Sequence, residues 1–297
     1  MSELYHVRRL FTLASYSTLI AVALPEPDAE DYSQILLYQA RSHIALNDPA
    51  SALALLPTSS PSLAIKAVRA LAQNALEELR DLAVEIEGDD CAADESEKSV
   101  VRVSAATAFA RAGEIEEALE TLGAGKPIED LDAVALIIQL YLSIRRPDLA
   151  RREFNRASKW AEDDLLLQHI EASIGLVTGA DGYANPHSYY AEQIASAAPN
   201  SQLLTARGTT HALRGNAREA AEDFASAVKS TKNKLGEPDA VANGVTVARK
   251  QADADTQLER LRKEYPNHAM VADIDAKSKL FDDLLANYTV PELPAAA

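Results

Sequence analysis

Residues 201–234 read SQLLTARGTTHALRGNAREAAEDFASAVKSTKNK, and this stretch decides the fold. Its first half is a helix pattern, in which apolar and small residues recur at three- and four-residue spacing. A polar turn around Gly215 follows, and the second half has the same spacing. The pattern rests on Leu204, Gly208 and His211 before the turn and on Ala220, Phe224 and Ala227 after it. The stretch predicts two antiparallel helices joined by a short turn.

The same pattern recurs in three other stretches, at 36–56, 106–122 and 134–157. The equivalent second-helix alanines are Ala52, Ala118, Ala150 and Ala220, whose separations of 66, 32 and 70 residues are each near a multiple of about 34. Weaker copies fill the intervals. The positions that we predict to pack one helix against another are Ala40, Ala52, Ala118, Tyr141, Ala150, Phe154, Gly208, His211, Ala220 and Phe224.

A period of about 34 residues with small residues where two helices face each other is typical of tetratricopeptide repeats. We expect Gly208 to face Ala220 and Ala40 to face Ala52, because antiparallel helices approach closely only where the facing residues are small. One helix pair cannot bury its apolar face alone, so the units should stack into a solenoid. The sequence therefore predicts an all-α solenoid of about eight helix pairs in one domain, 1–290, with a closing helix at 270–287.

Three segments depart from this regularity. Residues 85–97 are rich in carboxylates, contain the single cysteine, Cys91, and are expected to form a long solvated loop. Residues 179–188 contain Gly182, Asn185 and Pro186 and are expected to form a turn-rich insertion within the sixth unit. The tail, 291–297, is expected to be disordered.

The N-terminus has two interpretations. His6, Arg8 and Arg9 precede an apolar run at 10–24, and this order resembles a signal peptide. The polar residues 15–18 divide the run in the middle, which favours two short helices joined by a turn.

Composition restricts the possible partners. The chain has 297 residues, 45 of them acidic and 29 basic, which gives a net charge of −16. A chain this acidic repels phosphate backbones and anionic lipids, so nucleic acid and direct membrane docking are disfavoured. A single cysteine allows no intramolecular disulfide and no cysteine zinc site, which is typical of a reducing cytosol. A protein partner is the class that remains.

Motifs for catalysis are lacking in the sequence, so we expect no enzyme, no cofactor and no metal. Residues 123–126, GAGK, lack the upstream glycine and the Ser/Thr of a phosphate-binding loop. His43 and His211 occupy the repeat position held elsewhere by Phe109 and Tyr141, which favours packing over metal ligation. The candidate interface anchors are Trp160, Tyr189 and Tyr190, and the alternative is that they fill gaps between units.

First helices of such repeats line a concave groove that suits a protein segment. The order of motifs along the chain resembles that of the epsilon subunit of coatomer, the coat of retrograde Golgi vesicles. The resemblance rests on ELYHVR at 3–8, SY at 15–16, DLARRE at 148–153, LVTG at 176–179, YY at 189–190, AK at 276–277 and FD at 281–282. It covers nearly the whole chain, and the acidic 85–97 stretch is a departure from it.

The resemblance implies a non-enzymatic coat component that holds the C-terminal domain of the alpha subunit in the curve of its repeats and stabilises it. It also implies other coatomer subunits as partners, retrograde Golgi-to-ER and intra-Golgi transport, and a peripheral place on the cytosolic side of Golgi membranes and COPI vesicles. Membrane recruitment would come from an Arf-type GTPase acting on other subunits. The main alternative is a tetratricopeptide adaptor, such as a co-chaperone with a basic clamp for an acidic peptide. An enzyme on a helical scaffold is the third class.

Overall fold

The computed structural model describes residues 3–88, 91–196, 200–230 and 235–288. In these ranges the regular elements are seventeen α-helices and one short 3-10 helix, with no strand. Their bounds are α1 Glu3–Thr12, α2 Tyr16–Ile20, α3 Tyr32–Ala45, α4 Pro49–Leu55, α5 Leu63–Gln73, α6 Leu76–Glu87, α7 Glu95–Ala112, α8 Ile115–Thr121, α9 Leu131–Ser143, α10 Pro147–Ala157, α11 Leu165–Thr178, η1 Ala180–Tyr183, α12 Ala184–Ser196, α13 Ser201–Leu213, α14 Ala217–Lys229, α15 Glu237–Val247, α16 Gln251–Glu264 and α17 Ala269–Ala286.

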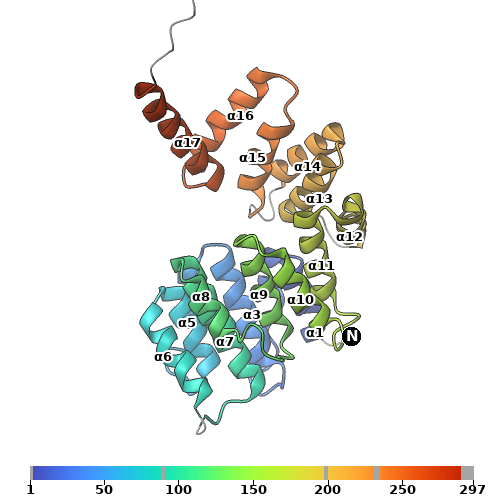
Figure 1. Ribbon diagram of the computed structural model, residues 1–297. Helices are drawn as coiled ribbons and strands as arrows, with labels where there is room; N and C mark the ends of the chain where they lie inside the picture. Colours follow the sequence, from blue (N-terminus) through green and yellow to red (C-terminus); the bar gives the residue numbers. More distant parts are fainter. Residues whose placement is uncertain (1–2, 89–90, 197–199, 231–234, 289–297) are drawn as a thin grey trace, which may run out of the picture.

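The helices follow one another as eight pairs, α1/α2 to α15/α16 within the described ranges, and α17 closes the series (Figure 1). The predicted all-α solenoid with a terminal helix is therefore confirmed. The pairs α1 to α10 form one body, and the later helices curve away from it, so that α15 to α17 arch back over an open side. The chain thus has an inner and an outer surface.

Helix starts are set by local chemistry. Asp48 caps α4 by accepting a hydrogen bond from the backbone N–H of Ser51, at 3.1 Å. Pro49 and Pro147 occupy the first turns of α4 and α10, where a missing N–H costs no hydrogen bond. Gly113 ends α7 in the left-handed conformation, with φ of 87°, which an L side chain adopts only with strain.

Small residues lie where the helices meet. Ala40, Ala52, Ala118, Ala150 and Ala220 have no exposed surface at all. Gly208 is also buried, but its nearest neighbours differ from the prediction: a Cβ there would lie 2.6 Å from Cε1 of Phe224 and 3.1 Å from Cβ of Asp223, and Ala220 is not among the three nearest atoms. The large ring on α14 therefore fills the space that the glycine on α13 leaves.

The predicted acidic loop at 85–97 is helical at both ends, so that prediction is wrong in its extent. Helix α6 continues to Glu87 and α7 begins at Glu95. The reason is N-terminal capping: Asp94 accepts a hydrogen bond from the backbone N–H of Glu97 at 2.7 Å, and carboxylates are favourable in a first helical turn. Only 88–94 connects the two helices, and 89–90 lie outside the described residues.

The predicted insertion at 179–188 is also shorter than expected. Gly179 to Tyr183 form the turn, and Gly179 and Gly182 have positive φ. Helix α12 then begins at Ala184 and contains Pro186 in its first turn, where proline is tolerated. The N-terminal interpretation of two short helices agrees with α1 and α2. The expected disordered tail, 291–297, lies outside the described residues.

Candidate partner-binding groove

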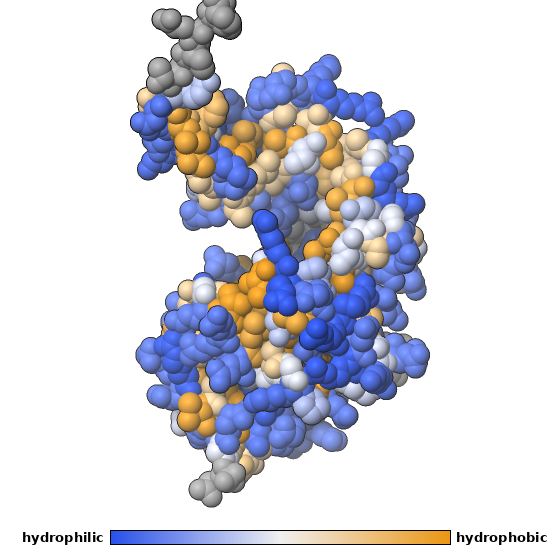
Figure 2. All heavy atoms as spheres, in the orientation of Figure 1, coloured by the Kyte–Doolittle hydropathy of each residue, from blue (hydrophilic) through white to orange (hydrophobic). Residues whose placement is uncertain are grey.

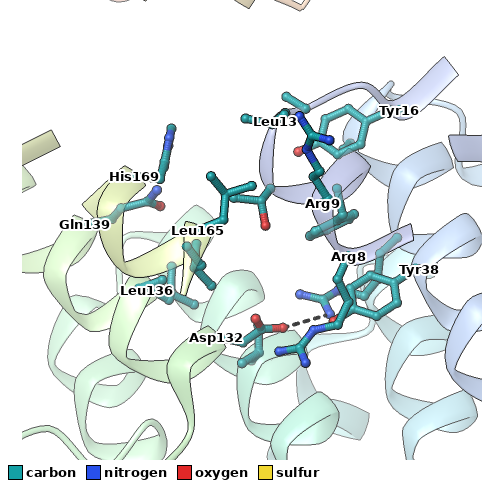
Figure 3. Close-up of a pocket in the computed structure, with 18 of the residues that line it drawn as sticks. Arg8, Arg9, Leu13, Tyr16, Tyr38, Asp132, Leu136, Gln139, Leu165 and His169 are labelled. Atoms are coloured by element: carbon teal, nitrogen blue, oxygen red, sulfur yellow. Dashed lines mark hydrogen bonds and ion pairs between the residues drawn. The ribbon is translucent and has the colours of Figure 1, made fainter. Parts of the chain in front are cut away.

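A groove runs along the inner surface, and it is lined by the first helix of each of the first seven pairs. We define it by seven apolar side chains, Phe11, Tyr38, Leu71, Val103, Leu136, Leu165 and Leu203, which come from α1, α3, α5, α7, α9, α11 and α13. It encloses a cavity of about 650 Å³. Figure 3 shows Arg8, Arg9 and Tyr38 facing Asp132, Leu165 and His169 across this space.

Helix α1 lies inside the curve and reaches the seventh pair. The Nδ2 group of Asn200 donates to the backbone oxygen of Leu13 at 2.8 Å and lies 3.2 Å from Oγ of Ser15. Arg9 donates to Oγ of Ser196 at 3.2 Å. The same Asn200 caps α13 by accepting from the N–H of Leu203. The N-terminal hairpin thus contacts the sixth and seventh helix pairs.

Two arginines on the groove floor, Arg8 and Arg41, lie beside acidic and aromatic side chains. Nη1 of Arg41 lies 3.4 Å from Oδ2 of Asp132, and its guanidinium lies 4.8 Å from the Phe11 ring centroid and 5.6 Å from that of Tyr38. Burial lowers the pKa of Arg8, but Tyr38 and Asp132 outweigh it and hold that pKa above its ordinary value. The guanidinium groups of Arg8 and Arg41 therefore already interact with other side chains of this chain.

Neutral polar groups lie along the same groove. Burial lowers the pKa of His169 to about 4, so its imidazole is uncharged at neutral pH. Its ring packs edge-on against Tyr189 and Tyr190, with centroids 5.7 and 6.2 Å away. Among the described residues, Nδ1 of His169 and Oγ of Ser104 are buried without a hydrogen-bond partner. Both residues line the cavity, where a bound chain could supply the missing partner.

One edge of the groove is acidic. It opens into a second cavity of about 910 Å³, where the first helices begin. We call this the acidic edge, and its carboxylates are Glu30, Asp94, Glu95, Glu97, Glu129, Asp130, Asp132 and Asp164. The basic side chains there are Arg8, Arg41 and Arg102. The excess of carboxylates favours a partner surface with lysines or arginines.

The predicted anchors fall in different places. Tyr189 and Tyr190 are 7% and 3% exposed and pack in the core with Leu13 and Leu203, which favours the alternative that they fill gaps between units. Trp160 is 36% exposed and lines the acidic edge. Of the remaining predicted packing residues, Phe224 is buried, whereas Tyr141 and Phe154 are partly buried against the core.

Histidine and carboxylate side chains form no metal site in the described ranges, since no group of three or more of them could hold an ion there. His43 lies 3.5 Å from Asp48, and the His211 ring lies 4.9 Å from that of His187. No helix in the described part of the chain is both long and apolar enough to cross a bilayer.

Sequence reasoning missed Arg8, Arg41 and Asp132 as groove residues, and Asn200 as the residue that joins the N-terminal hairpin to the seventh pair. The pattern of small and apolar residues marks packing and carries no signal for polar contacts between distant repeats. Asn200 was visible only as a possible helix cap, because asparagine before an apolar run is a common start signal.

Paired helices, small residues at the crossings and a groove lined by first helices define a helical-repeat protein of the tetratricopeptide type. A crystal structure of a tetratricopeptide repeat protein from Parabacteroides merdae is similar in fold, with a TM-score of 0.54 and 14% sequence identity. The similarity covers 82% of this chain and 97% of that one.

Residues 1–289 match the sequence model of the family described as Coatomer epsilon subunit, so the chain belongs to that family. The probable coatomer subunit epsilon of Schizosaccharomyces pombe is 24% identical over 286 residues, which are 95% of this chain and 93% of that protein. The coatomer subunit epsilon of Caenorhabditis elegans is 25% identical over 290 residues, covering 94% and 96%. The chain is thus a component of coatomer, the COPI vesicle coat.

Proposed function

We propose that this chain forms one domain over 1–290, and that its groove holds and stabilises the C-terminal domain of the alpha subunit of coatomer. In this role the chain is non-enzymatic, meets other coatomer subunits within the coat, and acts in retrograde Golgi-to-ER and intra-Golgi transport. It lies on the cytosolic side of Golgi membranes and reaches the membrane only through the coat.

The observation that carries this proposal is the groove itself. First helices of seven pairs line it, so a single bound domain can contact many repeats at once. The helices are already ordered, so binding costs little conformational entropy. Apolar side chains give contact area, and buried polar groups without partners, such as Oγ of Ser104, favour a protein segment that can satisfy them.

A basic clamp for an acidic peptide is the second candidate, and the four arginines of the groove are the observation in its favour. These are Arg8, Arg9, Arg41 and Arg111. Arg41 is paired with Asp132 and packed against two rings, so it does not present a free cation. The acidic edge would repel an acidic peptide. These contacts support the coat-component proposal over the clamp.

Calorimetric titration of the purified chain with the C-terminal domain of the alpha subunit tests the proposal. We expect binding by the natural chain and its loss when Leu136 and Gln139, which line the groove on α9, are both changed to arginine. The matched control is Val84→Arg, a 74% exposed position on α6 outside the groove, which should bind normally. Equal binding by all three chains, or none by the natural chain, would contradict the proposal.

A further inference from the structure

The connections between the two helices of each pair lie at the edge of the solenoid where the first helices end, opposite the acidic edge, where they begin. In the last four pairs these connections are 144–146, 179–183, 214–216 and 248–250. They contain five basic residues and one acidic residue, although the whole chain has 29 basic against 45 acidic residues. We call the five basic residues the basic edge: Arg145, Arg146, Arg214, Arg249 and Lys250.

Helix dipoles alone do not explain this cluster. A cation is favourable beside the C-terminal end of any helix, so each pair should show one. The connections of the first four pairs contain no basic residue and two acidic ones, Asp48 and Glu114. Those connections are 13–15, 46–48, 74–75 and 113–114. The basic edge is therefore a property of the last four pairs and has a further cause.

Most of the basic edge is unpaired within the chain. Arg146 lies 2.8 Å from Asp148. The side chains of the other four residues are exposed, and in the described part of the chain no residue forms an ion pair or a side-chain hydrogen bond with them. The pKa of His187 is lowered by burial and then by Arg214, so this imidazole does not compensate the neighbouring charge. The edge thus presents positive charge to solvent.

Exposed apolar side chains accompany these cations. Ile144, Val177 and Leu213 lie within one residue of the ends of α9, α11 and α13, and they are 44%, 55% and 44% exposed. Hydrophilic side chains cover most of the face that Figure 2 shows, so exposed apolar side chains beside unpaired cations are a distinct feature of the surface. These side chains and the basic edge line neither the groove nor the acidic edge. The two surfaces are therefore separate.

Arg145 is held in a backbone conformation that arginine rarely adopts. Its φ is 60°, in the left-handed region. In five other pairs the residue with positive φ that follows the first helix is an asparagine or a glycine, which tolerate this conformation. These residues are Asn47, Asn74, Gly113, Gly179 and Gly215. An arginine kept at a strained position indicates a use for its charge beyond the fold.

We propose that the basic edge is a second protein-binding surface and that it takes an acidic linear segment of another protein. Aspartate and glutamate side chains of the segment face the cations, and its apolar side chains cover Ile144, Val177 and Leu213. Packed helices are about 8–10 Å apart and an extended chain rises about 3.3 Å per residue, so acidic residues about three positions apart meet cations of neighbouring helices. This surface goes beyond the proposed function and does not depend on it.

Two other occupants fit less well. An anionic bilayer is flat, so it would also meet Asp181, Glu219 and Asp253, which are exposed at the same edge. A narrow segment follows the cations and avoids these carboxylates. A second copy of the chain would present its acidic edge, but the association would join two molecules that each have a net charge of −16. The charges therefore favour a segment of a different protein.

The test measures the dissociation constant of the full chain for a fluorescein-labelled peptide of four Asp-Glu-Leu repeats, by fluorescence anisotropy. A peptide of four Asn-Gln-Leu repeats is the uncharged comparison. The edge variant carries Arg145→Gly, Arg214→Ser and Arg249→Ser. The control variant removes the same charge at exposed lysines away from this edge, and far-UV spectra check that both variants fold. Its substitutions are Lys159→Ser, Lys263→Ser and Lys279→Ser.

At low ionic strength we expect the acidic peptide to bind the natural chain and the control variant within about twofold of each other. The edge variant should bind it about tenfold more weakly, because three exposed ion pairs are lost. The uncharged peptide should not bind. Arg145→Gly alone should weaken binding and leave the unfolding midpoint unchanged or higher, because glycine at a φ of 60° carries no strain.

Other results would overturn the proposal. Equal losses in the edge and control variants would mean that net charge, and not this edge, governs binding. No binding of the acidic peptide, or equal binding of the uncharged one, would contradict the acidic segment. A lower unfolding midpoint for Arg145→Gly would show that this arginine serves the fold. Flotation with phosphatidylserine vesicles, or self-association in sedimentation, that only the edge variant abolishes would replace the occupant. Loss of the alpha-subunit domain by the edge variant would show that the two surfaces are one site.

Discussion

The side chain of Asn200 donates a hydrogen bond to the backbone oxygen of Leu13, 2.8 Å away and 187 positions earlier in the chain. This contact joins the N-terminal hairpin to the seventh helix pair. Asn200 is 4% exposed, so both partners are shielded from water and neither can exchange this bond for one to solvent without opening the groove. The position of the N-terminal hairpin thus depends on a contact with the start of the seventh helix pair.

Replacing Asn200 by alanine should destabilise the chain by about 2–3 kcal/mol, because it removes both a helix cap and a buried hydrogen bond. Urea unfolding measures the loss. The matched control is Asp48→Ala, which removes the surface cap of α4 and should cost about 1 kcal/mol. Equal losses for the two variants would show that the contact with Leu13 adds nothing to stability.

Introducing tryptophan at Ala220 should destabilise strongly. Ala220 has no exposed surface and packs with Leu204 and Phe224, so the ring has no room unless α13 and α14 separate. Overpacking typically costs about 1–3 kcal/mol, and this change is larger than most. Its neighbour Ala221 is exposed, so Ala221→Trp serves as the control and should leave the unfolding midpoint nearly unchanged. An equal effect at both positions would contradict the assigned repeat register.

His169 should contribute to the pH dependence of the free energy of unfolding. Burial lowers the pKa of His169 to about 4 from 6.5, so the folded chain binds fewer protons than the unfolded chain between these values. Its contribution to stability therefore rises with pH across that window, and is lost as the pH falls from about 6.5 to about 4. In urea titrations at a series of pH values, His169→Gln should flatten this dependence. His6→Gln, at an exposed position, should not.

Carboxylates between 85 and 97 should differ in how much they contribute to stability, because some cap or brace a helix and others are only exposed to solvent. Asp94 caps α7, and Glu97 accepts a hydrogen bond from Ser62, so Asp94→Ala should cost about 1 kcal/mol of stability. Glu85 is exposed at the end of α6, and Glu85→Ser should change stability by less than about 0.5 kcal/mol. Binding kinetics at low and high salt complete the test: we expect Asp94→Ala to slow association at low salt only. A loss of partner binding at both salt concentrations would contradict this division.

Much of the fold could be predicted because repeats are encoded locally. The small residues Gly208, Ala40 and Ala220 recur at helical spacing within one unit, and each unit needs the next one to cover its apolar face. Eight pairs and a closing helix followed from that pattern. Capping was less visible, because a carboxylate such as Asp94 can be read either as a solvated loop residue or as a helix start.

The site was predicted only in outline. A groove lined by first helices follows from the repeat, but its contents do not. The packing of α1 between α3 and α11 and the burial of Tyr189 and Tyr190 arise from contacts between residues far apart in the chain. Periodicity measures which side of a helix is apolar, and it cannot tell whether that side meets the core, a distant repeat or another protein. The amino-acid pattern by itself therefore determined a solenoid of paired helices. Only the tertiary structure decided which apolar surfaces are buried within the chain and which stay exposed. The reason is that the curvature of a solenoid is the sum of small rotations between successive pairs.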